Sequence, residues 1–213
     1  MANAVYLLAA GGHGRVVLDA LLASGVTVSG VLDPSLEVGD QVFGVSVLGG
    51  DEFLDDLSIS DVRLVNGLGA ASSVIDRALL FETMTQRGFA FKEVRHPSAV
   101  IGRGCDLGND AQIMAGAVLQ NQVRIGANAV INTRASIDHD CVIGPHAFIS
   151  PGAVLCGDVK IAESAFVGAG AVLLPGIQVG AHAVVGAGSV VINAVPEGWT
   201  VAGNPATKIG PKN

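Results

Sequence analysis

Four side chains with potential for chemistry stand together in the stretch IDHDCVIGPH: Asp138, His139, Asp140 and Cys141. A histidine titrates at about pH 6.5, and a neighbouring carboxylate can orient the imidazole and stabilise its charged form. The same cluster could instead hold zinc, which needs three or four ligands that converge on one point. The secondary structure that carries these side chains sets their directions, and those directions distinguish a general base from a metal site or a solvated turn.

A six-residue repeat sets the direction of each side chain in this region. Residues 101–196 divide without a gap into consecutive hexads, in which the first residue is always Ile, Leu or Val and the fifth is small or aliphatic. Strand alternation of period two, as in a Gly-rich antiparallel protein, would not restrict only these two positions. The repeat therefore predicts a parallel β-helix, with three hexads in each coil and residues 18 apart stacked.

This register separates the polar cluster. Cys141 is a fifth residue and points inward, whereas His139 is a third residue and points outward, so the two cannot share a metal ion. His146 lies around the next corner. Cys105 and Cys141 share a column two coils apart, which is too far for a disulfide. We therefore predict no metal site.

Residues 1–95 have a different pattern, in which apolar runs alternate with helical spacing. The expected strands are 4–10, 27–34, 62–69 and 89–95, and the expected helices are 15–24, 51–57 and 71–88. Such alternation indicates a parallel sheet with helices on its faces. We predict a small Rossmann-like α/β domain over 1–95 and an all-β parallel β-helix over 96–213, joined at HPSA.

The sequence AAGGHG follows the first expected strand and opens a helix, where free backbone N–H groups suit a phosphate. Val17 replaces the third glycine of a dinucleotide fingerprint, so a nucleotide diphosphate fits better than NAD. His13 would contact pyrophosphate or sugar, unless it is simply a solvated turn histidine. The expected substrate-binding residues of this domain, at the carboxyl ends of its strands, are Gly11, Gly12, His13, Gly14, Asp33, Asn66 and Gly67.

Composition excludes several classes of partner. The formal net charge is −7, which argues against nucleic acid or an anionic membrane as the main partner. No apolar run approaches the roughly 18 residues of a spanning helix, and the first residues lack the basic region of a signal peptide. Three cysteines without framework spacing favour a reducing compartment, so we expect a cytoplasmic protein.

The sixth residues of the hexads form three outward columns. Two columns are largely apolar: the first contains Val118, Ser136, Val154, Val172 and Val190, and the second contains Gln112, Val130, Phe148, Phe166 and Val184. The third column is mostly polar and contains Asp106, Arg124, Val142, Lys160 and Gln178. Exposed apolar strips mark interfaces between subunits. Two such sides on a three-sided prism predict a closed homotrimer.

Four motifs together resemble one known family. AAGGHGRVVLDAL, HPSAVIG, INTRASIDHDCVIG and VAGNPATKIG are similar, in this order, to the PglD/NeuD/PerB type of sugar-nucleotide acetyltransferase from bacterial glycan synthesis. The resemblance implies a trimeric left-handed β-helix enzyme that uses acetyl-CoA. It further implies acetylation of the amine of a nucleotide-linked 4-amino-4,6-dideoxy sugar, with UDP as the expected nucleotide. The alternatives are O-acetylation of a sugar or sialic acid hydroxyl and, in a third class, a non-catalytic scaffold or sensor.

The resemblance also suggests roles for individual residues. His139 would be the general base, Asp140 its orienting partner and Gly157 a donor to the thioester oxygen. The 18-residue stacking, independently of the resemblance, places Asn121 one coil before His139, where it would bond substrate or His139 itself. The tail would close over CoA through Gly203, Asn204, Pro205, Ala206 and Lys208. Phe148 stands where relatives often carry a second histidine, and His146 cannot be assumed to replace it.

Overall fold

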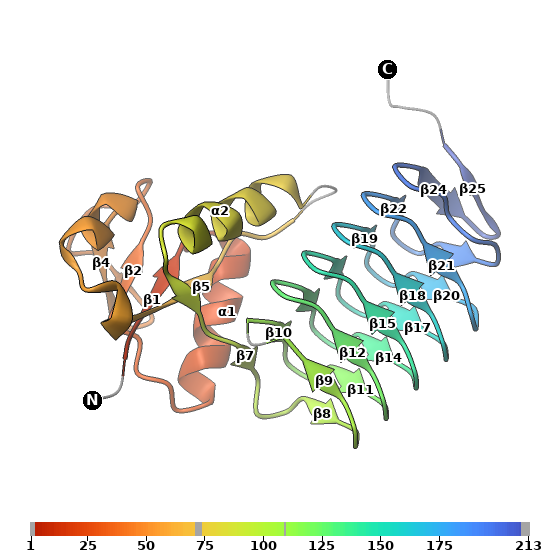
Figure 1. Cartoon of the computed structure of the whole chain (residues 1–213), viewed down its shortest axis with the longest axis horizontal. Coiled ribbons are helices and arrows are strands. Elements are labelled where there is room, and N and C mark those ends of the chain that lie inside the picture. The colour runs from red at the N-terminus through yellow and green to blue at the C-terminus, as the bar shows by residue number, and fades with distance from the viewer. Residues whose placement is uncertain (1–2, 71–73, 109, 210–213) are drawn as a thin grey trace.

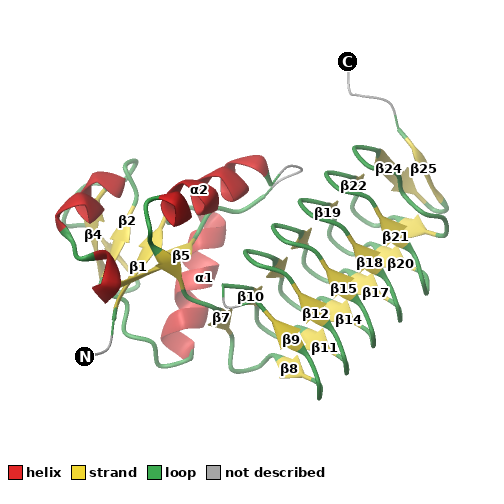
Figure 2. Cartoon of the chain, viewed as in Figure 1, coloured by secondary structure: helices red, strands yellow, loops and turns green. Residues whose placement is uncertain are grey.

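The computed structural model describes residues 3–70, 74–108 and 110–209. It consists of an α/β domain and a triangular β-helix, which lie side by side along the long axis of the molecule (Figures 1 and 2). The predicted fold class is thereby confirmed.

The α/β domain is built on a sheet with strand order β3-β4-β2-β1-β5-β6. Its elements are β1 Ala4–Leu8, α1 Gly12–Ala23, β2 Gly30–Leu32, β3 Gln41–Val42, β4 Val45–Gly49, the 3-10 helices η1 Asp51–Asp56 and η2 Ile59–Asp61, β5 Val62–Asn66, α2 Ile75–Gln86 and β6 Ala90–Phe91. β1 is continuously apolar because both of its faces are covered: Val5 and Leu7 pack toward α1, and Leu8 packs with Met84 of α2.

The β3–β4 hairpin was not expected from the sequence, which suggested a smaller sheet. Its two-residue turn consists of Phe43 and Gly44, both with positive φ, as a type I′ turn requires. Phenylalanine rarely adopts this conformation, so the segment lacks the usual Asn-Gly or Asp-Gly signal. β4 pairs in parallel with β2 and extends the sheet beyond the strands that were predicted.

The β-helix has three sheets, named here by their surroundings. The docked sheet contains β7 Val94–Arg95, β10 Gln112–Ile113, β13 Val130–Ile131, β16 Phe148–Ile149, β19 Phe166–Val167, β22 Val184–Val185, β24 Thr200–Gly203 and β25 Ala206–Lys208. The open sheet contains β8 Val100–Ile101, β11 Val118–Leu119, β14 Ser136–Ile137, β17 Val154–Leu155, β20 Val172–Leu173 and β23 Val190–Val191. The polar sheet contains β9 Asp106–Leu107, β12 Arg124–Ile125, β15 Val142–Ile143, β18 Lys160–Ile161 and β21 Gln178–Val179.

Strands in neighbouring coils pair in parallel at the predicted spacing of 18 residues, as Val130 pairs with Phe148. The first residues of the hexads fill the interior together with the fifth: Ile137 and Cys141 are both fully buried. Many fourth residues adopt the left-handed conformation that turns the corner; Asp140, for example, has φ 61°. The inward and outward positions read from the sequence are therefore correct.

The strand predicted over 89–95 is divided between the two parts of the molecule. β6 pairs with β5 in the α/β sheet, whereas β7 pairs with β10 in the docked sheet. Only Lys92 and Glu93 separate them. The chain thus passes from one sheet directly into the other.

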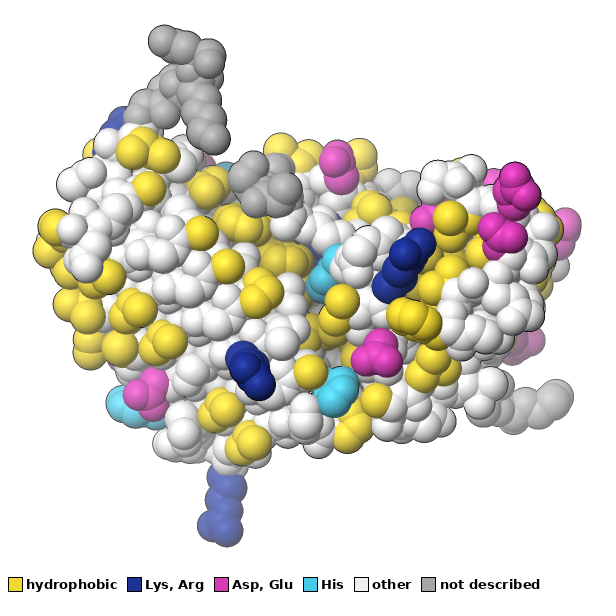
Figure 3. All heavy atoms as spheres, turned by 180° about the vertical axis from the view of Figure 1, so that it is seen from behind, with side chains coloured by type: hydrophobic (Ala, Val, Ile, Leu, Met, Phe, Trp, Pro, Cys, Tyr) yellow, Lys and Arg dark blue, Asp and Glu magenta, His cyan; other side chains and the backbone are white. Residues whose placement is uncertain are grey.

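The docked sheet is covered by the α/β domain of the same chain. Val130, Phe148 and Phe166 are buried in one cluster with Val17 of α1. This corrects part of the argument for a trimer, because one of the two apolar columns is not available to another subunit. The open sheet keeps an exposed apolar surface, including Val100 and Val154. Hydrophobic side chains lie in rows over the β-helix half when the molecule is seen from behind (Figure 3).

Candidate active site

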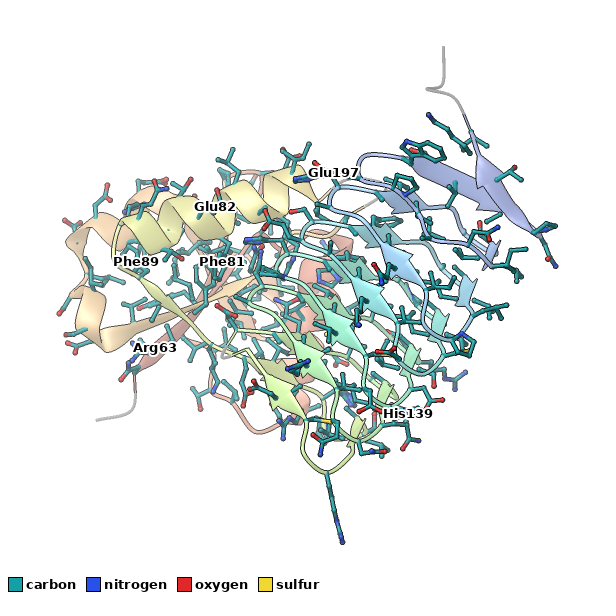
Figure 4. The ribbon with its side chains drawn as sticks, turned by 45° about the vertical axis from the view of Figure 1, so that its right-hand side comes forward. Arg63, Phe81, Glu82, Phe89, His139 and Glu197 are labelled. Carbon is teal, nitrogen blue, oxygen red and sulfur yellow. The ribbon has the colours of Figure 1, made fainter. Side chains whose placement is uncertain are left out.

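His139 lies at the corner between the open sheet and the polar sheet, on the outside of the β-helix and away from α2 (Figure 4). Its Nδ1 is 2.8 Å from Oδ2 of Asp140, and its backbone N–H donates to Oδ1 of Asp138 at 2.8 Å. The left-handed backbone of Asp140 brings its carboxylate to the ring. The adjacent carboxylates thus act differently: Asp140 holds the imidazole, and Asp138 holds the turn.

This arrangement fixes how the His139 ring can carry a proton. A carboxylate only accepts hydrogen bonds, so Nδ1 carries hydrogen and Nε2 of the neutral ring has a free lone pair. The hydrogen bond to Asp140, followed by the nearby charge of Asp138, raises the pKa of His139 above its ordinary value. His139 is therefore a stronger base than a free histidine, and its basic nitrogen faces away from Asp140.

Gly157 lies one coil after His139, directly beside its ring. A Cβ at this position would be 2.6 Å from both Cε1 and Nε2 of His139, so any side chain here requires the ring to move. Within the described residues, no hydrogen-bond acceptor meets the Gly157 N–H. His139 and Gly157 line one side of a cavity of about 550 Å³, to which Cys156 and Pro175 also contribute. A basic nitrogen and a bare amide therefore border the same space.

The other members of the polar cluster lie where the register placed them. Asn121 is exposed one coil before His139, and its carbonyl accepts from the Asp140 N–H at 3.1 Å. Cys141 points inward and donates to the Cys156 carbonyl, and burial raises the pKa of its thiol to about 11. Among the described residues no group of three or more His, Cys, Asp or Glu side chains could hold a metal ion.

A second cavity, of about 730 Å³, lies between the start of α1 and the docked sheet; we call it the crevice. Gly11 is the residue before α1, and Gly12 begins the helix and lines the crevice. A side chain at either position would meet nothing within 4 Å. The first-turn N–H groups of a helix have no partner within the helix and favour an anion. The glycine-rich turn therefore presents bare backbone to an open space, as a diphosphate would require.

Gly14 and Gly67 have a different reason to be glycine. A Cβ on Gly14 would lie 2.2 Å from the Ala9 carbonyl oxygen, and one on Gly67 would lie 2.0 Å from the same atom. These residues let the beginning of α1 pack against the ends of β1 and β5. They shape the crevice, whereas Gly12 lines it and Gly11 precedes Gly12 in the chain.

Asp33 and Asn66 are buried and bonded within the protein. Asp33 accepts from the Ala10 N–H and from both the N–H and hydroxyl of Ser35. Burial raises its pKa, but the bonds from Ser35 and Ala10 outweigh this effect and lower the pKa overall. Asn66 is only 2% exposed; its amide donates to Arg77 and Asn128, and its oxygen accepts from Leu68. Its side chain therefore supports the crevice and has no free hydrogen for a ligand.

His13 is not a solvated turn residue. Its ring lies in the crevice against Phe148, with ring centroids 5.6 Å apart, and its Nε2 is 3.2 Å from Oε1 of Gln112. Burial, with a smaller effect from Arg77, lowers the pKa of His13 to about 4. The two histidines near the two cavities are thus shifted in opposite directions.

Residues that the sequence analysis did not select connect the domains. Gln112 of the docked sheet, Asn128 and the buried Arg77 of α2 all hydrogen-bond to Asn66. Gln112 carries a signal in the sequence, since it is the polar member of its apolar column. His146 bonds to Asn128 and lies edge-on to Phe81, so it belongs to this domain contact and not to the crevice.

The tail forms a hairpin that extends the docked sheet. β24 pairs with β22 in parallel and with β25 in an antiparallel manner, and Asn204 and Pro205 form the turn. Gly203 has φ 104°, which favours glycine. The Lys208 ammonium lies 4.0 Å from the centre of the Trp199 ring. The tail residues predicted to contact CoA are therefore held in a defined structure at the end of the β-helix.

The two cavities lie at different corners of the β-helix. The crevice includes Thr133 and Pro151, which come between strands of the docked sheet and the open sheet. His139 comes after the open sheet. The whole width of the open sheet thus separates the glycine-rich turn from His139 within one chain.

Family comparisons match both parts of the chain. Residues 4–73 match the model described as the PglD N-terminal domain, and residues 122–157 and 158–193 match the bacterial transferase hexapeptide model. The chain is 36% identical to PerB from Caulobacter crescentus, solved with CoA and GDP-perosamine; the match covers 98% of each chain with a TM-score of 0.89. The chain belongs to the PglD/PerB family of sugar acetyltransferases.

Other members of the PglD/PerB family agree. The acetyltransferase domain of PglB from Neisseria gonorrhoeae, solved with acetyl coenzyme A, is 31% identical over 98% of this chain and 100% of that chain, with a TM-score of 0.89. WeeI from Acinetobacter baumannii is 26% identical over 97% of this chain and 99% of that chain, with a TM-score of 0.86. Comparison with curated sequences gave no significant match. This family member is an acetyl-CoA-dependent sugar-nucleotide acetyltransferase, as its motifs indicated.

The contact between Gly157 and His139 gives a first prediction. Replacing Gly157→Ala should displace the His139 ring, break its bond to Asp140 and reduce activity, with little loss of folding stability because the exposed ring can move. The pKa of His139, followed by NMR titration, should fall toward the ordinary histidine value in this variant, since the bond to Asp140 is the largest cause of its rise. An unchanged pKa of His139 would show that the methyl group does not displace the ring.

Proposed function

We propose that this enzyme transfers the acetyl group of acetyl-CoA to the amine of a nucleotide-linked 4-amino-4,6-dideoxy sugar, with His139 as the general base. The observation that carries the proposal is the His139–Asp140 bond, which leaves a basic Nε2 beside the bare amide of Gly157. This is the pair of groups that acyl transfer to an amine needs: a proton acceptor and a donor for the developing oxyanion.

The chemistry follows from these groups. The sugar amine attacks the thioester carbonyl, a C–N bond forms, and Nε2 of His139 takes the proton that the nitrogen loses. Asp140 stabilises the resulting imidazolium, and the Gly157 N–H donates to the oxyanion. When the C–S bond breaks, the proton passes from Nε2 to the leaving CoA thiolate, which restores the neutral imidazole.

The nucleotide sugar is proposed to bind through the crevice. The open backbone of Gly11 and Gly12 would hold the diphosphate, within a frame kept in shape by Gly14, Gly67, Asp33 and Asn66. UDP is the nucleotide we propose; the relative PerB is solved with GDP-perosamine, which makes GDP the comparison. O-acetylation of a sugar or sialic acid hydroxyl is the second candidate, because the same base could serve a hydroxyl.

CoA is proposed to lie along the β-helix between His139 and the tail. Gly203, Asn204, Pro205 and Ala206 would contact its pantetheine or adenine, and Lys208 its phosphates. Asn121, with its side chain free of hydrogen bonds to the described residues, would bond the acceptor. All three cysteines are free, which suits action in the reducing cytoplasm.

A homotrimer would resolve the separation of the two cavities. The open sheet, with its exposed valines, is the face we propose to lie against a neighbouring subunit. The crevice of one chain would then face the His139 corner of the next. Within a single chain the open sheet keeps these sites apart, so the site is complete only between subunits.

A thiol-release assay with acetyl-CoA tests the activity. Against a panel of UDP-, GDP- and dTDP-linked 4-amino sugars, the wild type should turn over at least one, and His139→Ala should lower kcat by about 10²–10⁴. His182→Ala, an exposed histidine at another turn of the β-helix, is the matched control and should keep full activity. Turnover of hydroxyl acceptors alone would favour O-acetylation, and full activity of His139→Ala would exclude His139 as the base.

The raised pKa of His139 gives a pH prediction. A general base works when it is neutral, so kcat/KM should fall as pH drops through the raised pKa, at a pH above that of an ordinary histidine. Asp140→Asn removes the largest cause of the shift and should move this acid limb to lower pH while reducing the maximal rate. An unchanged limb in the variant would show that another group controls the profile.

Mixing two inactive variants tests the shared site. His139→Ala removes the base, and Gly12→Asp places a negative charge in the crevice without a steric clash. Neither variant should be active alone, but trimers assembled from both should regain activity because one interface pairs two intact halves. Sedimentation should show a trimer in every case. Trimers that contain both chains yet stay inactive would argue for a site within one chain.

A further inference from the structure

Gln112 is held in one orientation by bonds at both ends of its amide. It is 1% exposed, on β10 of the docked sheet. Its Nε2 donates to the backbone oxygen of Asn66 at 2.7 Å, and a carbonyl oxygen can only accept. The amide nitrogen must therefore face Asn66, which leaves Oε1 to face Nε2 of His13 at 3.2 Å.

This orientation determines the tautomer of His13. Oε1 of Gln112 is an acceptor, so Nε2 of His13 must carry the hydrogen of that bond. A neutral imidazole has one hydrogen, and the lone pair therefore lies on Nδ1. Within the described residues, Nδ1 has no hydrogen-bond partner.

The surroundings of His13 keep its ring neutral and directed into the crevice. Burial is the main cause that lowers the pKa of His13 to about 4, and the charge of Arg77 of α2 lowers it further. The Arg77 guanidinium donates to the carbonyls of Asn66 and Leu68. Phe148 packs against the ring from the docked sheet. A Cβ on Gly69 would lie 2.8 Å from Cβ of His13, so glycine leaves space beside it.

We propose that Gln112 is a positioning residue that holds His13 as the Nε2–H tautomer, so that Nδ1 accepts a hydrogen bond from a hydroxyl or N–H of the nucleotide sugar. An ionised phosphate has no hydrogen to offer and cannot satisfy this lone pair. Two groups in the crevice therefore bind different parts of the ligand. Backbone N–H groups bind the diphosphate, and the His13 ring accepts from a neutral donor on the ribose or the sugar. This inference rests on the proposed function for the identity of the ligand.

The tautomer is measured directly on the full chain labelled with ¹⁵N-histidine. Long-range ¹H–¹⁵N correlation spectra distinguish a protonated from an unprotonated ring nitrogen, and His13→Gln assigns the signals. At neutral pH we expect His13 with hydrogen on Nε2 alone, and in Gln112→Leu a mixture of tautomers. Hydrogen on Nδ1, or a doubly protonated ring, would overturn the proposal. This readout needs no turnover, so it stands apart from success or failure of the acetylation assay.

Ligand binding provides the second readout. The active nucleotide sugar should shift Nδ1 of His13, as a hydrogen bond to its lone pair requires, whereas sulfate, a fully ionised anion with no hydrogen to donate, should not. A sulfate-induced imidazolium, or an Nδ1 signal that no nucleotide sugar changes, would contradict the assignment. The nucleoside diphosphate alone then tells which donor is used: a shift identifies the ribose, and no shift identifies the sugar.

Two substitutions separate the ring nitrogens. His13→Asn can place its amide oxygen near the position of Nδ1 and so keeps an acceptor there. His13→Gln can place its amide nitrogen near the position of Nε2, but it offers no acceptor at the position of Nδ1. We expect His13→Gln to raise KM for the nucleotide sugar roughly five- to tenfold, as for one lost hydrogen bond, and His13→Asn to raise it less. Gln112→Leu should raise the same KM with little change in kcat or in KM for acetyl-CoA. Equal effects on both substrates would indicate a merely structural role.

Discussion

The constraint on which this structure depends is the hydrogen-bond ladder between coils 18 residues apart. Each short strand is held by the coils before and after it, as Val130 is held by Gln112 and Phe148. Because the coil length is fixed, the position of a residue in its hexad determines whether its side chain is buried or exposed. The ladder thus places Gly157 beside His139, and it turns Cys141 away from both. The six-residue repeat therefore determines how His139 and Gly157 are placed relative to each other.

Much of the fold and one half of the site could be predicted from sequence for this reason. The columns read from the hexads correspond to the three sheets, and Asn121, His139 and Gly157 stack as expected. The α/β domain was predicted less completely, because its β3–β4 hairpin turns at Phe43 without a conventional turn sequence. Periodicity also could not show which apolar column would be covered by the same chain.

The residues missed by sequence analysis are those whose partners are far away in the chain. Asn66 was predicted to meet substrate because it lies toward the carboxyl end of a strand, but its side chain is used by Arg77 and Asn128. Arg77 occupies a helix position in line with the buried Met84, so a charged residue there indicated an unusual environment. The contacts of Arg77 depend on how the two domains pack, and a local sequence pattern holds no information about that packing. Long-range pairing of polar groups is thus the part of the site that only the structure supplies.

The passage of the chain from β6 to β7 has a mechanical consequence. Two residues, Lys92 and Glu93, connect a strand of the α/β sheet to a strand of the β-helix, and both strands are hydrogen-bonded to their own sheets. So short a connection between two paired strands restrains rotation of one domain against the other. The buried contact of α1 on the docked sheet adds to this restraint. We therefore expect substrates to enter and leave without a wide opening of the two domains of one chain.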